Sequence, residues 1–180
     1  MGRWDDVSDY LWLIDKHDPS QSRWELNQLL LALKRIEIET VLEIGVHRGG
    51  SLRLWRSAFL PSLCVGINWT DEYEGDIGDL VLITGRPSQD PETLDRVQSA
   101  LSEKSVDFLF IDGGHSYEEV SQDWTNYSGL VRSGGVVALH DVVIEAGVWK
   151  FWLWLEARHR TSLFYEGDGA PGTGTGMVWL

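Results

Sequence analysis

The sequence has 180 residues, 43% hydrophobic and 24% charged, a composition typical of one globular domain rather than a disordered chain. Its formal net charge is -13, and an acidic surface repels phosphate backbones and anionic lipids, so we expect neither nucleic acid nor membrane partners. Cys64 is the only cysteine, which excludes an internal disulfide or thiolate metal cluster. No signal peptide or membrane-spanning apolar run is recognisable, so we predict a cytoplasmic location.

The chain is predicted to consist of an N-terminal segment and one domain. Residues 1–21 are acidic and contain tryptophan, and we interpret them as either a lid over a ligand or a frayed terminus. Residues 22–180 form the predicted domain. A helix opens it, because Ser22 and Glu25 have the capping-box spacing and apolar residues follow at helical spacing from Leu26 to Ile36.

Short runs rich in apolar or β-branched residues alternate with helical patterns through the domain. These runs are Thr40 to Gly45, Leu63 to Asn68, Leu80 to Thr84, Val106 to Asp112 and Val136 to Asp141. Continuous apolar runs of this length are typical of strands buried on both faces of a parallel sheet. The alternation predicts a three-layer, doubly wound α/β fold.

Capping patterns mark the helices between these strands. Asp90 precedes a proline and opens one helix, and the capping box from Ser116 to Glu119 opens another that is predicted to run to about Val131. Gly134 and Gly135 are expected to separate that helix from the next strand.

The last part of the chain is predicted as a helix from Gly147 to His159, a strand at Thr161 to Tyr165, a loop from Gly167 to Gly176 and a strand at Met177 to Leu180. The helix is apolar on nearly every face. We therefore expect it to be buried all round, with a homodimer contact through Trp152 or Trp154 as the alternative.

The turn from Glu43 to Ser51 joins the first strand to a helix, where an open α/β sheet binds its ligand. Dinucleotide binding requires G-x-G-x-x-G, but His47 stands at the second glycine. A phosphate-binding P-loop requires lysine after its last glycine, and Ser51 stands there. S-adenosylmethionine fits better, because it lacks a pyrophosphate and its positive charge favours a nearby acid such as Glu43. A glycine-rich turn without a ligand is the alternative.

A second group of polar residues lies at strand ends. Asp112 ends one strand and His115 follows it, while His140 and Asp141 end the next. In a parallel sheet these ends share one rim. Asp112, Asp141 and one imidazole could bind a divalent cation. Alternatively, an aspartate orients His115 or His140 as a general base, or His140 is simply a buried histidine.

At these residues the sequence resembles the class I S-adenosylmethionine-dependent methyltransferases. Ile111 to Tyr117 matches I-D-G-x-H-x-Y, and Gly134 to Asp141 matches G-G-x-x-x-x-H-D. The branch with both motifs includes small-molecule O-methyltransferases and relatives of cephalosporin hydroxylase. The resemblance implies a Rossmann-like sheet of about seven strands, mostly parallel, with the last strand antiparallel.

The resemblance also implies roles for individual residues. Its implied cofactor-binding residues are Glu43, Gly45, Gly49, Ser51, Asn68, Arg86, Ser88 and Asp112. Mg²⁺ or another divalent cation would be held by Asp112, His140 and Asp141. Catalysis would rest on His115 as base, with Asp112 and Asp141 anchoring the acceptor.

Two positions depart from the family pattern. Asn68 stands where relatives have an acid that holds the ribose hydroxyls, which predicts weaker cofactor binding. His140 stands where metal-dependent enzymes often have an acid.

The main hypothesis is methyl transfer from S-adenosylmethionine to a hydroxyl of a small molecule such as a sugar or natural product. The alternatives are a non-catalytic nucleoside-binding or scaffold protein and an oxygenase-like enzyme.

Overall fold

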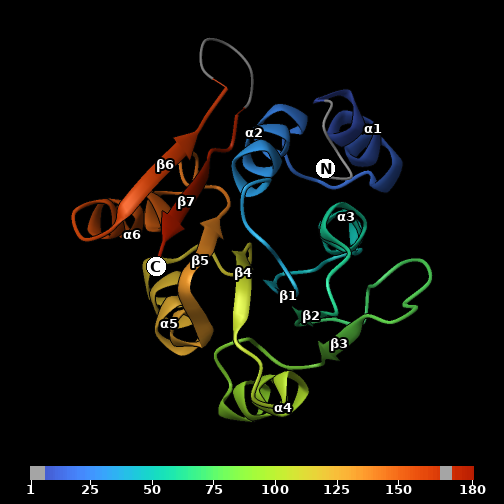
Figure 1. Ribbon diagram of the computed structural model, residues 1–180. Coiled ribbons are helices and arrows are strands. Elements are labelled where there is room, and N and C mark those ends of the chain that lie inside the picture. Colours follow the sequence, from blue (N-terminus) through green and yellow to red (C-terminus); the bar gives the residue numbers. More distant parts are fainter. Residues whose placement is uncertain (1–6, 167–171) are drawn as a thin grey trace.

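The computed structural model describes residues 7–166 and 172–180, so part of the predicted loop from Gly167 to Gly176 lies outside the described residues. The centre of the fold is a seven-stranded sheet with the order β3-β2-β1-β4-β5-β7-β6 (Figure 1). Its strands are β1 (Thr40–Ile44), β2 (Leu63–Asn68), β3 (Val81–Thr84), β4 (Val106–Ile111), β5 (Val131–Leu139), β6 (Arg160–Phe164) and β7 (Thr175–Trp179).

Strand direction follows the prediction. Strands β1 to β5 pair in parallel, and β7 runs antiparallel to both of its neighbours, β5 and β6. The continuous apolar runs of β1 and β4 are buried at every position, because helices cover both faces of the sheet. The doubly wound fold with an antiparallel last strand is therefore confirmed.

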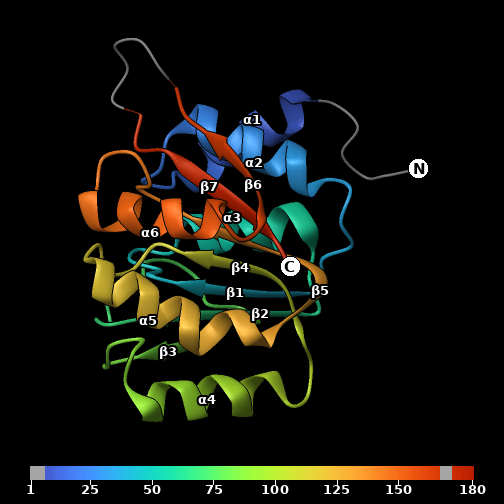
Figure 2. The ribbon, with the colours of Figure 1, turned by 90° about the vertical axis from the view of Figure 1, so that its left-hand side faces the viewer.

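Helices form the two outer layers. They are α1 (Val7–His17), α2 (Arg23–Leu33), α3 (Gly50–Phe59), α4 (Pro91–Leu101), α5 (Tyr117–Tyr127) and α6 (Ala146–Glu156). Figures 1 and 2 show α1, α2 and α3 on one face and α4, α5 and α6 on the other. Each layer packs on its own hydrophobic cluster, and α1 contributes Tyr10, Leu13 and Ile14 to the first. Among the described residues no helix is long and apolar enough to cross a membrane.

The boundary before β5 differs from the prediction. Helix α5 ends at Tyr127, a short 3-10 turn follows, and β5 already begins at Val131. Gly134 and Gly135 therefore lie inside the strand, where the pairing with β4 shifts register. Gly134 has φ +79, and a Cβ on Gly135 would lie 3.0 Å from the Asp107 carbonyl oxygen. The two glycines permit an irregularity in the strand rather than ending a helix.

The tryptophan-rich helix α6 is not buried all round, contrary to the prediction. Trp152 is 1% exposed and lies against Gly176 of β7, whereas Trp149, Leu153 and Trp154 are 40%, 46% and 38% exposed. The sheet covers only one side of this helix. Of the two tryptophans predicted for a homodimer contact, only Trp154 is therefore open to solvent.

Candidate active site

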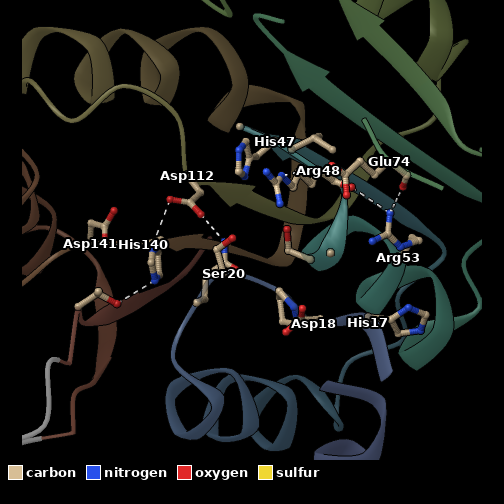
Figure 3. Close-up of a pocket in the computed structure, with 17 residues that line it drawn as sticks. His17, Asp18, Ser20, His47, Arg48, Arg53, Glu74, Asp112, His140 and Asp141 are labelled. Atoms are coloured by element: carbon tan, nitrogen blue, oxygen red, sulfur yellow. Dashed lines mark hydrogen bonds and ion pairs between the residues drawn. The ribbon is translucent and has the colours of Figure 1, made fainter. Parts of the chain in front are cut away.

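Two cavities open at the carboxyl ends of the parallel strands. The first, which we call the Asn68 cavity, has a volume of about 490 Å³ and is bordered by Asn68, Trp69, Ser88 and Gly113. The second, the Asp141 cavity, has a volume of about 520 Å³. Its walls come from the α1–α2 loop, the β1–α3 turn and the ends of β4 and β5, as Figure 3 shows. Gly45, His47 and Asp112 line both cavities.

Glu43 lies behind the β1–α3 turn rather than on a cavity wall. Its side chain is fully buried in β1, and the Ser51 hydroxyl donates a hydrogen bond to its Oε1 atom. Burial raises the pKa of Glu43 to about 8, against the opposing effect of the Ser51 hydrogen bond, and the nearby Asp112 carboxylate raises it further. Ser51 lines the Asp141 cavity, so Glu43 is linked to that cavity by its hydrogen bond with Ser51 rather than by direct contact.

The Asn68 side chain is engaged at both ends by its own chain. Its Oδ1 atom accepts from the His47 backbone N–H at 3.0 Å, and its Nδ2 atom donates to the Thr70 carbonyl at 2.8 Å. The amide thereby joins the end of β2 to the β1–α3 turn. Trp69 beside it is 71% exposed and borders the same cavity, so its ring is available for stacking.

The segment after β3 borders the Asn68 cavity through Pro87, Ser88 and Gln89. Arg86 forms ion pairs with Asp90 and Glu92 and does not line the cavity. The Ser88 hydroxyl donates to Oδ1 of Asp123 at 2.7 Å. Asp123 is fully buried on α5, and this burial raises its pKa to about 7. The sequence prediction missed Asp123.

A periodic signal could have revealed Asp123. The buried positions of α5 are Val120, Asp123, Trp124 and Tyr127. Their i, i+3, i+4, i+7 spacing places the acid on the stripe that faces the sheet.

His140 lies between the two predicted catalytic carboxylates. Its Nδ1 atom is 3.1 Å from Asp112 Oδ1 and 3.2 Å from Asp141 Oδ1. Burial alone would lower the pKa of His140, but the hydrogen bonds to both carboxylates outweigh it and raise the pKa to about 10. Burial would raise the pKa of Asp141, but its hydrogen bonds from His115 and His140 hold it below the usual value.

His115 lies at the edge of this group. Its Nε2 atom is 3.0 Å from Asp141 Oδ2, its Nδ1 atom is 3.9 Å from Glu145 Oε1, and its side chain is 42% exposed. The Asp141 hydrogen bond raises the pKa of His115 against the opposing effect of partial burial. The structure thus brings together Asp112, His115, His140 and Asp141.

The donor atoms of this group suit a divalent cation. The set that lies together contains His115, whereas the metal prediction from the family resemblance named His140 and stays a prediction. Ligand atoms of Asp112, His115 and Asp141 all lie within 4.8 Å of one another. His140 uses Nδ1 toward the two aspartates and Nε2 toward the Thr173 hydroxyl, 2.8 Å away. Carboxylate and imidazole donors of this kind fit a divalent cation, with His115 as the third ligand.

Residues near the N-terminal helices also reach the site. The lid interpretation of residues 1–21 included Gln21 without naming it, and the prediction gave Glu25 only a capping role. Gln21 Nε2 donates to Asp112 Oδ2 at 2.5 Å. Ser22 caps α2 as expected, but the Glu25 side chain does not complete the capping box. It is fully buried and binds residues 173 to 175 instead. In the sequence, Glu25 lies one helical turn before Leu29, on the face of α2 that is buried, and this position was the available signal for its role. No comparable sequence pattern marked Gln21.

The fold and the residues at its rim define a Rossmann-like protein of the methyltransferase type, and comparisons with known proteins agree. Residues 42–142, more than half of the chain, match the family model described as "Methyltransferase domain". The chain therefore belongs to the methyltransferase domain family.

One curated relative is protein y4gI of Sinorhizobium fredii, 35% identical over 135 residues. The match covers 65% of this chain and only 15% of that relative.

Solved structures share the fold at low sequence identity. The O-methyltransferase TomG from Streptomyces achromogenes, in complex with SAM, has a TM-score of 0.67 and 19% identity over 99% of this chain and 91% of that one. The methyltransferase MycE of the mycinamycin pathway, with Mg and SAH, has a TM-score of 0.71 and 20% identity. The match covers 98% of this chain and 55% of MycE. A caffeoyl-CoA O-methyltransferase homologue from Staphylococcus aureus has a TM-score of 0.71 and 14% identity. The match covers 98% of this chain and 93% of that one.

Proposed function

We propose that this protein transfers the methyl group of S-adenosylmethionine to a hydroxyl of a small polar molecule. The observation that carries the proposal is the pair of cavities that meet at Gly45, His47 and Asp112. Methyl transfer is an in-line displacement, so donor and acceptor must approach one point from two sides. The Asn68 cavity would hold the nucleoside, and the Asp141 cavity would hold the acceptor. Membership of the methyltransferase domain family supports this assignment.

His115 is the proposed general base. Its ring lines neither cavity and would act from the rim beside Asp141, which lines the Asp141 cavity. Asp141 Oδ2 can only accept a hydrogen bond, so His115 Nε2 carries the proton of that contact and Nδ1 is left to take the proton of the acceptor hydroxyl. Asp141 thus orients the ring and stabilises its protonated form. When bound, S-adenosylmethionine would supply the methyl group and leave as S-adenosylhomocysteine as its sulfur–methyl bond breaks, while His115 would hold the proton of the acceptor hydroxyl.

A divalent cation is proposed as an optional participant, supported by the Mg named with MycE. Asp112, Asp141 and His115 would hold it, and when bound it would lower the pKa of an acceptor hydroxyl. In that arrangement His115 would be a ligand rather than the base.

The N-terminal segment is proposed to cover the acceptor. Asp18, Ser20 and Gln21 from the loop after α1 line the Asp141 cavity, and Figure 3 shows Asp18 and Ser20 across it from His47. The end of the N-terminal segment, residues 17–21, would therefore contribute to acceptor recognition, with residues 22–180 as the methyltransferase domain. A homodimer through Trp154, a cytoplasmic location and the absence of nucleic-acid binding stay predictions.

Calorimetry with S-adenosylhomocysteine tests the function directly. We expect micromolar binding, followed by methyl transfer when S-adenosylmethionine is supplied with a panel of polyhydroxylated acceptors. Absence of cofactor binding would instead favour the non-catalytic alternative.

A further inference from the structure

Glu25 connects helix α2 to the segment that enters β7. Its fully buried carboxylate accepts three hydrogen bonds: from the Thr173 hydroxyl at 3.1 Å, the Gly174 backbone N–H at 2.9 Å and the Thr175 hydroxyl at 3.2 Å. The Gly174 bond alone would join α2 to this segment. The Thr173 bond does more, because the same hydroxyl also contacts the His140 ring.

The direction of these hydrogen bonds follows from the groups involved. Thr173 has one hydroxyl proton and lies between Glu25 Oε2 at 3.1 Å and His140 Nε2 at 2.8 Å. The Glu25 carboxylate only accepts, so the Thr173 proton points to Glu25. The Thr173 oxygen must then accept from His140 Nε2–H.

The other side of the His140 ring is determined in the same way. Its Nδ1 atom faces Asp112 Oδ1 and Asp141 Oδ1, which are both acceptors. Each ring nitrogen therefore donates, one toward Thr173 and the other toward the aspartates. A ring held by hydrogen bonds at both nitrogens has one orientation, and that orientation places its Nδ1–H between the two carboxylates.

We propose that Glu25 and Thr173 are positioning residues of the active site, which act through the His140 ring to fix the Asp112 and Asp141 carboxylates. The proposal rests on the proposed function where turnover is measured, but the ring itself can be observed without turnover. It also gives α2 a role in the reaction that its capping sequence did not indicate.

The first test compares three variants in the segment before and within β7. Thr173→Val removes the link to His140, Thr173→Ser keeps a hydroxyl, and Thr175→Val is the matched control because Thr175 binds Glu25 without contacting His140. We expect Thr173→Val to lower kcat on the order of 10- to 100-fold, as displacement of reacting groups by about 1 Å does. Thr173→Ser and Thr175→Val should retain turnover. Thr173 borders the Asp141 cavity and not the Asn68 cavity, so the acceptor KM is measured together with kcat. Affinity for S-adenosylhomocysteine should change less than kcat in Thr173→Val, because Asp112 is only one of the residues that border the Asn68 cavity.

The second test observes the ring by nitrogen-15 NMR of histidine-labelled protein. In Glu25→Gln, the amide oxygen should face the Gly174 N–H, which needs an acceptor. The amide NH₂ group then faces Thr173 and donates to its hydroxyl oxygen. The Thr173 hydroxyl should then reverse and donate to His140 Nε2, which loses its proton and changes its nitrogen-15 shift. Wild-type protein, Thr173→Ser and Thr175→Val should show a protonated Nε2.

Two results would overturn the proposal. One is an unchanged His140 Nε2 signal in folded Glu25→Gln protein, and the other is full turnover by Thr173→Val. If no variant, including the wild type, transfers methyl groups, the proposed function fails, and the nitrogen-15 spectra still decide whether Glu25 and Thr173 orient the ring.

Discussion

Gly45 packs directly on the backbone of Asp112, so closely that a Cβ atom on Gly45 would lie 1.8 Å from the Asp112 carbonyl oxygen. Asp112 N donates to the Ile44 carbonyl at 2.8 Å, and Gly45 N donates to the Ile67 carbonyl at 2.9 Å. The ends of three neighbouring strands are thereby joined where the two cavities meet. Only glycine fits this position, because its φ is +88 and no side chain has room.

Replacing Gly45 with alanine should abolish cofactor binding and lower the free energy of unfolding, because Asp112 must move. The matched control is Gly85→Ala, since Gly85 has φ +85 but no atom within 4 Å of an added Cβ. The control should cost only the backbone strain, about 1–3 kcal/mol. Thermal unfolding and calorimetry with S-adenosylhomocysteine measure both effects. Equal losses of stability in the two variants would contradict the prediction, because they would show that the Asp112 backbone can move away from an added Cβ atom without a loss of stability.

His115→Ala should lower kcat by about 100- to 10,000-fold, the usual contribution of a general base, and leave cofactor binding intact. The ring does not border the Asn68 cavity, so the nucleoside has no contact to lose. His159→Ala is the control, because His159 packs on Trp124, whereas His115 contacts Asp141 in the rim group. Steady-state kinetics with calorimetry separates the two steps. Wild-type turnover in His115→Ala would reject the assignment of the base.

The rate should rise with pH through a midpoint above 6.5, the unperturbed pKa of histidine. The hydrogen bond that His115 donates to Asp141 raises the pKa of His115, so the ring keeps its proton, and cannot act as base, until a higher pH. Asp141→Asn removes the largest cause of the raised pKa of His115, so the midpoint of the pH dependence of kcat/KM should move downward. Glu145→Gln should move the midpoint less. The Glu145 carboxylate lies 3.9 Å from His115 Nδ1, and its charge raises the pKa of His115 less than Asp141 does. A midpoint insensitive to Asp141→Asn would contradict this origin of the pH profile.

The sequence predicted the fold and the active-site rim well, because both follow from local patterns. Buried strands are continuous apolar runs, and the parallel arrangement brings Asp112, His115, His140 and Asp141 to one edge. The contacts of Glu25 with residues 173 to 175 could not be predicted from the sequence. They join positions almost 150 apart in sequence, and no local period encodes such a pairing.

Asn68 shows how a family resemblance can identify a position without predicting its contacts. The missing carboxylate was visible in the sequence and predicted weaker binding of the ribose. The structure adds that the amide is already used, toward the His47 N–H and the Thr70 carbonyl. Which partners an amide finds depends on the conformation of two loops, and loop conformation is not read from residue type alone.

Asn68→Asp should therefore not improve cofactor binding. The carboxylate keeps the acceptor for His47 N–H but cannot donate to the Thr70 carbonyl, which should lower the free energy of unfolding by about 1 kcal/mol. Asn68→Ala, which loses both hydrogen bonds without placing a second acceptor against the Thr70 carbonyl, is the comparison variant. Chemical denaturation and calorimetry with S-adenosylhomocysteine measure the two quantities. Tighter binding at unchanged stability would mean that the side chain leaves His47 and reaches the ribose.

Removal of divalent cations distinguishes the two forms of the proposed mechanism. If His115 acts as base without a metal, chelator-treated protein should retain its turnover, because removal of the acceptor proton by the imidazole needs no cation. If a cation bound by Asp112, His115 and Asp141 acidifies the acceptor, treatment with a chelator should abolish turnover and Mg²⁺ or Mn²⁺ should restore it. Asp141→Asn separates the cases further, since loss of a charged ligand should weaken cation affinity measured by calorimetry. We expect retained turnover, and strict dependence on added cation would assign His115 as a ligand instead of the base.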